Sequence, residues 1–150
     1  MPGRPVSEIA WGTLPLLVDT SAWARAHRPE VRERWREALL GDQLRLSPAV
    51  RLEILFSAGD GDAFDRLAEH LAAIRPAPLS NSVLRAAEAA MGALACRSAG
   101  AHRLPVVDYL VAAAAQETGA AVLHYDHDYD TLAEVLEFES VWLATPGSLP

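Results

Sequence analysis

Short apolar segments alternate along this chain with longer stretches of helical periodicity, and this alternation limits the possible folds more than any other feature. We expect strands in the apolar runs at residues 14–18, 44–47, 120–123 and 141–144. The segments between them have the apolar spacing of helices. Strands separated by helices form parallel sheets that helices cover on both faces. The sequence therefore predicts an α/β protein, built as a three-layer α/β/α sandwich with a central parallel sheet.

The expected helices are bounded by ordinary start and stop signals. Pro29, Pro48 and Pro105 stand at helix starts, and Gly100 and Gly119 close two helices. The 150 residues contain no internal repeat, linker or low-complexity tract, so one domain is expected. We place that domain at residues 14–145, with an N-terminal extension at 1–13 and a C-terminal tail at 146–150.

The single cysteine and the lack of a long apolar segment indicate a cytoplasmic protein. One thiol cannot form an intramolecular disulfide, which suits a reducing compartment. Cys96 lies in an alanine-rich helical pattern, where we expect a small buried side chain. No segment approaches the ~18 apolar residues of a membrane-spanning helix. Proline and glycine interrupt the first residues, which do not resemble a signal peptide. We expect no membrane partner.

The charge of the chain excludes several functions. Its formal net charge of -7 argues against nucleic-acid binding through a broad basic surface. A nucleic-acid enzyme with an acidic metal site remains compatible with that charge. All 13 basic residues are arginine, so mechanisms that need a lysine ammonium, such as Schiff-base chemistry, are excluded.

Four acidic residues stand at positions that suggest a shared site. Asp19 directly follows one predicted strand and Asp126 lies shortly past another, and the carboxyl ends of parallel strands meet at one edge of a sheet. Glu53 and Asp108 lie within apolar helical segments, where carboxylates are rarely buried without partners. Arginine salt bridges or helix caps are one explanation for Glu53 and Asp108. Convergence of all four acids at one edge is the other.

Convergence of these acids would require a cation. At a separation of ~5 Å and an effective dielectric constant of ~20, two carboxylates repel by roughly 3 kcal/mol. A divalent ion removes this repulsion, and an all-carboxylate site suits Mg²⁺ or Mn²⁺. His124 and His127 flank Asp126, but strand alternation directs them away from it, so we do not expect them to be ligands.

The segment HYDHDYDTL allows two other interpretations, and both are disfavoured. Asp126, Asp128, Asp130 and Glu137 have the spacing of an EF-hand calcium loop. However, Thr131 occupies the position where that loop needs glycine, and a strand precedes it. A phosphoaspartate hydrolase would need a threonine where this chain has Asp130.

Four separated motifs resemble PIN-domain ribonucleases, and among them the VapC toxins of type II toxin–antitoxin systems. The motifs are VDTSAW, the isolated Glu53, CRSAGAHRLPVVDYLVAAAA and LHYDHDYDTLAEV, in this order. The resemblance extends from Leu16 to Trp142 and implies a PIN-like fold for the predicted domain. It also implies a catalytic, metal-binding role for Asp19, Glu53, Asp108 and Asp126, with Asp128 as an auxiliary metal ligand. Thr20 or Ser21 matches the hydroxyl residue that holds the first aspartate.

The resemblance implies a Mg²⁺- or Mn²⁺-dependent endoribonuclease toxin that uses a two-metal mechanism. It further implies a cognate VapB-like antitoxin, which inserts an arginine among the acids, and a homodimer. A catalytically silent PIN-like binding or scaffolding module is the alternative.

RNA contacts are expected from local arginines, because the overall charge is unfavourable. Arg97 matches an arginine near the substrate groove of similar proteins. Arg25, Arg28, Arg32 and Arg36 form a possible basic stripe near Asp19. Both features have a simpler explanation as charges on solvated helix faces. Trp23 and Trp35 belong either to such a surface or to the core.

Overall fold

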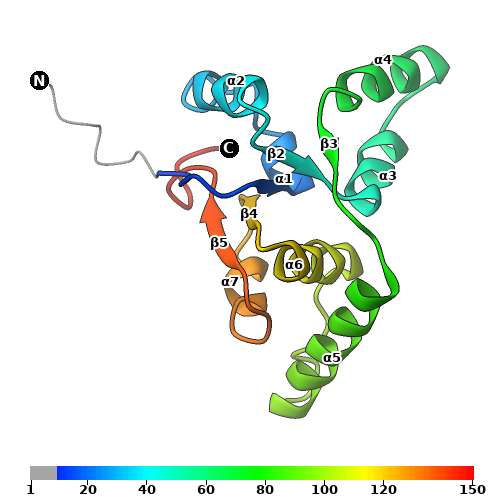
Figure 1. Ribbon diagram of the computed structural model, residues 1–150, viewed down its shortest axis with the longest axis vertical. Coiled ribbons are helices and arrows are strands. Elements are labelled where there is room, and N and C mark those ends of the chain that lie inside the picture. The colour runs from blue at the N-terminus through cyan, green and yellow to red at the C-terminus, as the bar shows by residue number, and fades with distance from the viewer. Residues whose placement is uncertain (1–9) are drawn as a thin grey trace, which may run out of the picture.

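The computed structural model describes residues 10–150 and shows a parallel sheet between layers of helices (Figure 1). The sheet has 5 strands in the order β3-β2-β1-β4-β5, all parallel. Its strands are β1 (Leu16–Val18), β2 (Leu44–Leu46), β3 (Arg75–Pro76), β4 (Ala121–His124) and β5 (Glu139–Trp142). The predicted α/β fold is confirmed. Most of the expected N-terminal extension, residues 1–9, lies outside the described residues.

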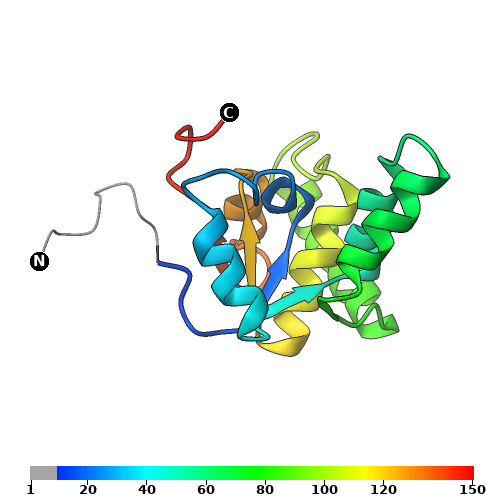
Figure 2. The ribbon, with the colours of Figure 1, turned by 90° about the horizontal axis from the view of Figure 1, so that it is seen from above.

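Helices cover both faces of the sheet, which confirms the three-layer arrangement. The helices are α1 (Thr20–Trp23), α2 (Arg32–Leu40), α3 (Pro48–Phe56), α4 (Gly61–Leu71), α5 (Asn81–Arg97), α6 (Val106–Thr118) and α7 (Asp128–Leu132). Figure 2 shows α2 on one side of the sheet and α5 and α6 on the other. Helices α3 and α4 pack together near β3 (Figure 1).

Strands β1 and β4 are buried along their whole length, because helices cover both of their faces. Every residue of β1 and β4 is buried, as expected for the interior of a parallel sheet. In the register of the sheet, Val18 lies opposite Leu123. Asp19, the next residue after β1, donates its backbone N–H to the carbonyl of Leu123 at 3.0 Å. The chain segments that leave β1 and β4 are therefore neighbours.

Helix α6 combines a buried alanine run with a sharp end. Its four consecutive alanines, residues 112–115, are fully buried, and the helix contacts α5, α3, α7 and β4. Small side chains allow this close packing from several sides. Gly119 ends the helix in the left-handed conformation, with φ of 69°. Ser47 caps α3 at its N-terminus, and Pro48 follows at the first helical position.

Two details of the fold differ from the sequence prediction. Strand β3 was not expected; it has two residues, and it pairs in parallel with β2 at Arg45 and Leu46. Cys96 is exposed, so the prediction that it is a buried core residue was wrong. Helix α5 buries a stripe that ends at Leu94, and a residue two positions further along points about 200° away.

The described residues on either side of the expected domain pack against it. Trp11 is buried and donates its indole N–H to the carbonyl of Leu143 at 3.1 Å. Leu149 is buried too, and its backbone N–H donates to the hydroxyl of Tyr125 at 2.7 Å. Over residues 10–150, no helix is both long enough and apolar enough to cross a membrane.

Candidate metal centre

Asp19 lies at the carboxyl end of β1 and is held in a fixed orientation. It is the N-cap of α1, with φ of -80° and ψ of 157°, and it is 4% exposed. Its Oδ2 atom accepts hydrogen bonds from the backbone N–H of Ser21 at 3.0 Å and from the Ser21 hydroxyl at 2.5 Å. Ser21 was one of two residues expected to hold this carboxylate. The other, Thr20, donates to Glu53 instead.

Asp108 lies in the first turn of α6 and is the least satisfied carboxyl group of the site. It is 6% exposed, and among the described residues its Oδ2 atom has no hydrogen-bond partner. Burial raises the pKa of Asp108, the negative charges of Asp19, Asp126 and Asp128 act in the same direction, and the resulting pKa is about 8. A buried carboxylate without partners is costly. This geometry fits a group that binds either a proton or a cation.

Asp126 and Asp128 follow β4 and complete an acidic cluster with Asp108. The three residues offer carboxylate oxygens that all lie within 4.8 Å of one another. The Asp126 Oδ1 atom accepts the backbone N–H of Asp128 at 2.9 Å, which fixes the turn between them. Burial and the charge of Asp126 raise the pKa of Asp128. This all-oxygen donor set, with the unpartnered atom of Asp108, could hold a metal ion.

Tyr129 connects Asp19 to the acidic cluster. Its side chain is fully buried, and its hydroxyl lies 2.7 Å from Asp19 Oδ1 and 3.4 Å from Asp108 Oδ1. Burial and then the charges of Asp19 and Asp108 raise the pKa of Tyr129 well above 10, so the hydroxyl keeps its proton as a donor. Sequence analysis did not identify this residue. The available signal was general: a buried tyrosine hydroxyl needs a polar partner.

His124 supports the turn that carries Asp126. It is fully buried, and its Nδ1 atom accepts the backbone N–H of Asp126 at 3.1 Å. Its Nε2 atom lies 2.7 Å from the hydroxyl of Ser140. Burial lowers the pKa of His124 to about 4, so the ring is neutral near pH 7. With both ring nitrogens engaged, His124 orients the turn, and His127 is exposed on its outer side.

Glu53 lies at the rim of the site. The sequence analysis placed it among apolar side chains that leave no polar face, and this was wrong, because Glu53 is exposed. Helix α3 buries only one stripe of its apolar residues, whereas Leu52 and Phe56 are 68% and 91% exposed. The carboxylate of Glu53 accepts the hydroxyl of Thr20, next to Asp19. Glu53 is not one of the three residues of the close acidic cluster.

The two arginines expected to bind RNA both have partners within the protein. Arg25 donates to the carbonyls of Ser21 at 2.9 Å and Pro150 at 3.1 Å, and it stacks over the ring of Tyr125. Arg97, at the end of α5, forms an ion pair with Glu134.

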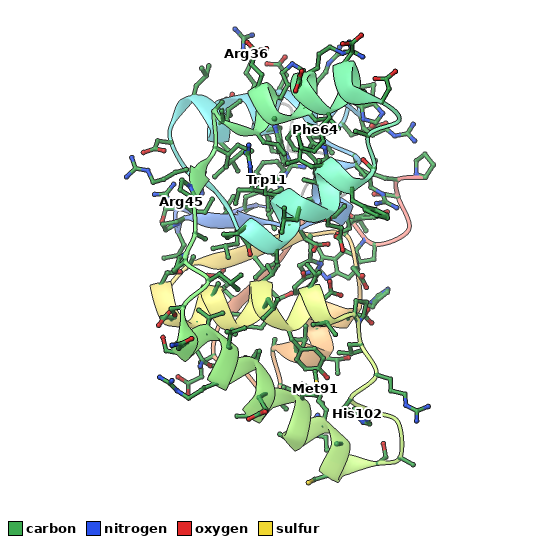
Figure 3. All side chains as sticks on the ribbon, turned by 90° about the vertical axis from the view of Figure 1, so that its right-hand side faces the viewer. Trp11, Arg36, Arg45, Phe64, Met91 and His102 are labelled. Atoms are coloured by element: carbon green, nitrogen blue, oxygen red, sulfur yellow. The ribbon has the colours of Figure 1, made fainter. Side chains whose placement is uncertain are left out.

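The remaining arginines of the possible basic stripe lie at the surface, Arg32 exposed and Arg28 half-buried, whereas the two nearby tryptophans pack inward. Arg36 is exposed and lies at the outer end of the molecule, opposite His102 (Figure 3). Trp35 is 9% exposed and packs edge-on against Trp23 at 6.1 Å between ring centroids. Trp35 is therefore a core residue, and Trp23 packs partly against the core.

Comparisons with known proteins agree with this fold. The PIN domain family model matches residues 16–135. Ribonuclease VapC18 of Mycobacterium tuberculosis is 38% identical over 88% of this chain and 97% of its own length. DNA-bound VapBC from Salmonella typhimurium superimposes with a TM-score of 0.67 at 15% identity, over 87% of this chain and 98% of that one. VapBC-5 from Mycobacterium tuberculosis, of the VapBC family of toxin–antitoxin systems, superimposes with a TM-score of 0.62 at 20% identity. The match covers 85% of this chain and 97% of that one. The chain belongs to the PIN domain family and, within it, to the VapC ribonucleases.

Proposed function

We propose that this protein is a metal-dependent endoribonuclease toxin that hydrolyses RNA phosphodiester bonds. The observation that carries the proposal is the cluster of Asp108, Asp126 and Asp128, in which one buried carboxylate oxygen has no hydrogen-bond partner within residues 10–150. The VapC18 relative, which is a ribonuclease, supports RNA as the substrate.

The ion that fits this site is Mg²⁺ or Mn²⁺. Both are hard cations that prefer oxygen ligands, and the cluster supplies only carboxylates. Asp108, Asp126 and Asp128 would hold the ion, with Asp19 beside them. When bound, a divalent ion activates water and neutralises charge on the phosphate. We keep Glu53 in the proposed set, as a contact for a second ion, because Thr20 holds its carboxylate near Asp19.

The side chains of the site contribute orientation and charge. Ser21 and Tyr129 fix both oxygens of Asp19, and His124 fixes the backbone that carries Asp126. An RNA phosphate is anionic, so the carboxylates by themselves repel it. Cleavage should therefore depend strictly on the divalent ion.

Substitution of the cluster tests the proposal. We expect Asp108→Asn and Asp126→Asn to reduce cleavage of a fluorescently labelled RNA by at least about 100-fold in Mg²⁺ or Mn²⁺. The exposed Asp65→Asn change on α4 is a matched control that should leave the rate unchanged. Circular dichroism verifies that each variant is folded. Cleavage at the wild-type rate in both cluster variants would contradict the mechanism, whereas an inactive wild type would favour a non-catalytic binding role.

We also propose a cognate VapB-like antitoxin, a homodimer and a cytoplasmic location. The solved VapBC structures support the antitoxin. The exposed apolar side chains of Leu52 and Phe56 on α3 offer contact area for a protein partner. Co-purification with the product of a neighbouring short gene, followed by loss of RNA cleavage in the complex, is the expected result. Cleavage at an undiminished rate in the complex would contradict neutralisation.

A further inference from the structure

The hydroxyl of Tyr129 is the one polar group in contact with both Asp19 and Asp108 among the described hydrogen bonds. It donates to Asp19 Oδ1 at 2.7 Å and lies 3.4 Å from Asp108 Oδ1. The two aspartates come from distant parts of the chain, the end of β1 and the start of α6. A single proton donor therefore sets the relative placement of two carboxylates that otherwise repel each other.

Tyr129 completes the hydrogen bonding of Asp19. Ser21 supplies both donors to Oδ2, and Tyr129 supplies the donor to Oδ1. Without the Tyr129 hydroxyl, the Oδ1 atom of Asp19 would lose the one side-chain donor that it has in the described part of the chain. Asp108 would lose the one hydrogen-bond donor near its Oδ1 atom, and its Oδ2 atom already has none among the described residues.

Packing contacts hold the ring of Tyr129 in place. The side chain is fully buried and stacks on His124, with 4.8 Å between ring centroids and 30° between ring planes. His124 in turn accepts the backbone N–H of Asp126. Helix α7, which carries Tyr129, contacts α6, which carries Asp108 (Figure 1). The side chain thus connects the segments that carry Asp19, Asp108 and Asp126.

We propose that Tyr129 is a positioning residue of the metal centre, whose hydroxyl holds Asp19 and Asp108 in the arrangement that receives the ion. The inference rests on the proposed function, because it assumes that the cluster binds a divalent cation. A phenylalanine would pack against His124 equally well, so packing does not account for the hydroxyl. Groups that orient metal ligands through hydrogen bonds commonly change metal affinity by about 10–100-fold when removed.

The test is the removal of a single oxygen. We expect Tyr129→Phe to weaken Mn²⁺ binding to the RNA-free protein about tenfold or more, measured by isothermal titration calorimetry. The Mn²⁺ concentration that gives half-maximal RNA cleavage should rise by a similar factor.

Tyr109→Phe is the matched control. Tyr109 is also fully buried and adjoins Asp108 in the chain, but its hydroxyl donates to the backbone carbonyl of His102 at 2.7 Å. Both variants lose one buried hydrogen bond, so a structural role alone would lower their thermal stability and leave Mn²⁺ affinity unchanged. Wild-type Mn²⁺ affinity in Tyr129→Phe would overturn the proposal.

Two further measurements separate the possible failures. If the wild type binds no Mn²⁺, or Asp108→Asn binds it equally well, the proposed function fails. If Asp108→Asn loses binding and Tyr129→Phe keeps it, only the positioning role fails. Should Tyr129→Phe not fold, NMR of wild-type protein labelled at tyrosine Cζ carries the test. Mg²⁺ should then shift the Tyr129 resonance more than that of Tyr109, and an unshifted Tyr129 resonance would overturn the proposal.

Discussion

Asp108 links the stability of this protein to its proposed metal binding. With no cation bound, burial and three neighbouring acids raise its pKa to about 8, so the folded protein keeps a proton there near neutral pH. A cation competes for the same carboxylate, and its binding releases that proton. Affinity for a divalent ion should therefore increase with pH up to about pH 8.

The same group makes the metal-free protein less stable as pH rises. The unfolded Asp108 side chain has its usual pKa of 3.8, and the folded one about 8. Between these values the folded state binds one more proton than the unfolded state, so the free energy of unfolding falls with increasing pH. The slope is on the order of 1 kcal/mol per pH unit for one proton.

Asp108→Asn should remove this pH dependence. In EDTA, we expect urea unfolding of the wild type to give a lower free energy at about pH 8 than at about pH 5. The variant should show a flatter profile and should be the more stable protein at the higher pH. Asp65→Asn, at an exposed position, should keep the wild-type profile. Parallel profiles for Asp108→Asn and the wild type would show that Asp108 is not the responsible group.

Individual site residues differed in how far the sequence could predict them. Asp19 and Asp126 follow strands, and Asp108 interrupts an apolar helix, so position and context identified all three. Tyr129 was missed, because it is flanked by Asp128 and Asp130 and its local sequence does not indicate a buried ring. Its role depends on where its hydroxyl lies, 2.7 Å from a residue 110 positions away, and no local pattern contains that distance.

At the scale of elements, α6 carries Asp108 and is positioned by its alanine run. Residues 112–115 are all fully buried, and α6 contacts both α5 and β4. Larger side chains at these positions would push α6 away from its neighbours, and Asp108 would move with the helix. The alanine run therefore contributes to the site although it lies outside it.

Ala113→Leu should destabilise the protein by about 1–3 kcal/mol, because overpacking forces side chains and backbone to shift. Ala95→Leu on the exposed face of α5 makes the same chemical change and should alter stability by no more than about 0.5 kcal/mol. Thermal and urea denaturation of the two variants give the comparison. Equal stability of both variants would mean that α6 has room for a larger side chain at this position.

The sequence predicted the buried elements better than the edge elements. Strands β1 and β4 are entirely buried, with only His124 polar, and were predicted within two residues. Strand β3 has two exposed residues, one of them proline, and so lacks any hydrophobic signal. In α3, apolar periodicity could not show that Leu52 and Phe56 face solvent. For this reason Glu53 was wrongly predicted to be buried. A rule that assigns hydrophobic residues to the core cannot predict which of them lie on the surface.

At the scale of the whole molecule, topology and charge act together. The order β3-β2-β1-β4-β5 places β1 beside β4, so acids from two distant chain segments meet at one edge. The formal net charge of -7 adds a repulsive background for RNA. Arg25 and Arg97 are engaged by Ser21, Pro150 and Glu134, which reduces the positive charge offered near the site. A divalent ion bound by the cluster would add local attraction for a phosphate.

This balance predicts that the acidic cluster inhibits RNA binding when metal is removed. Replacing Asp108, Asp126 and Asp128 with Asn changes the formal net charge from -7 to -4, and Asp108 is only partly ionised in the metal-free wild type at about pH 8. In EDTA at about pH 8 and low salt, we expect this triple variant to bind a labelled RNA several-fold more tightly than the wild type, measured by fluorescence anisotropy. The difference should shrink as salt screens the charges, with a Debye length of about 10 Å at 0.1 M. The control carries Asp62→Asn, Asp65→Asn and Glu69→Gln at exposed positions and has the same formal net charge of -4. Equally tighter RNA binding by this control would assign the effect to overall charge and contradict a role of the cluster.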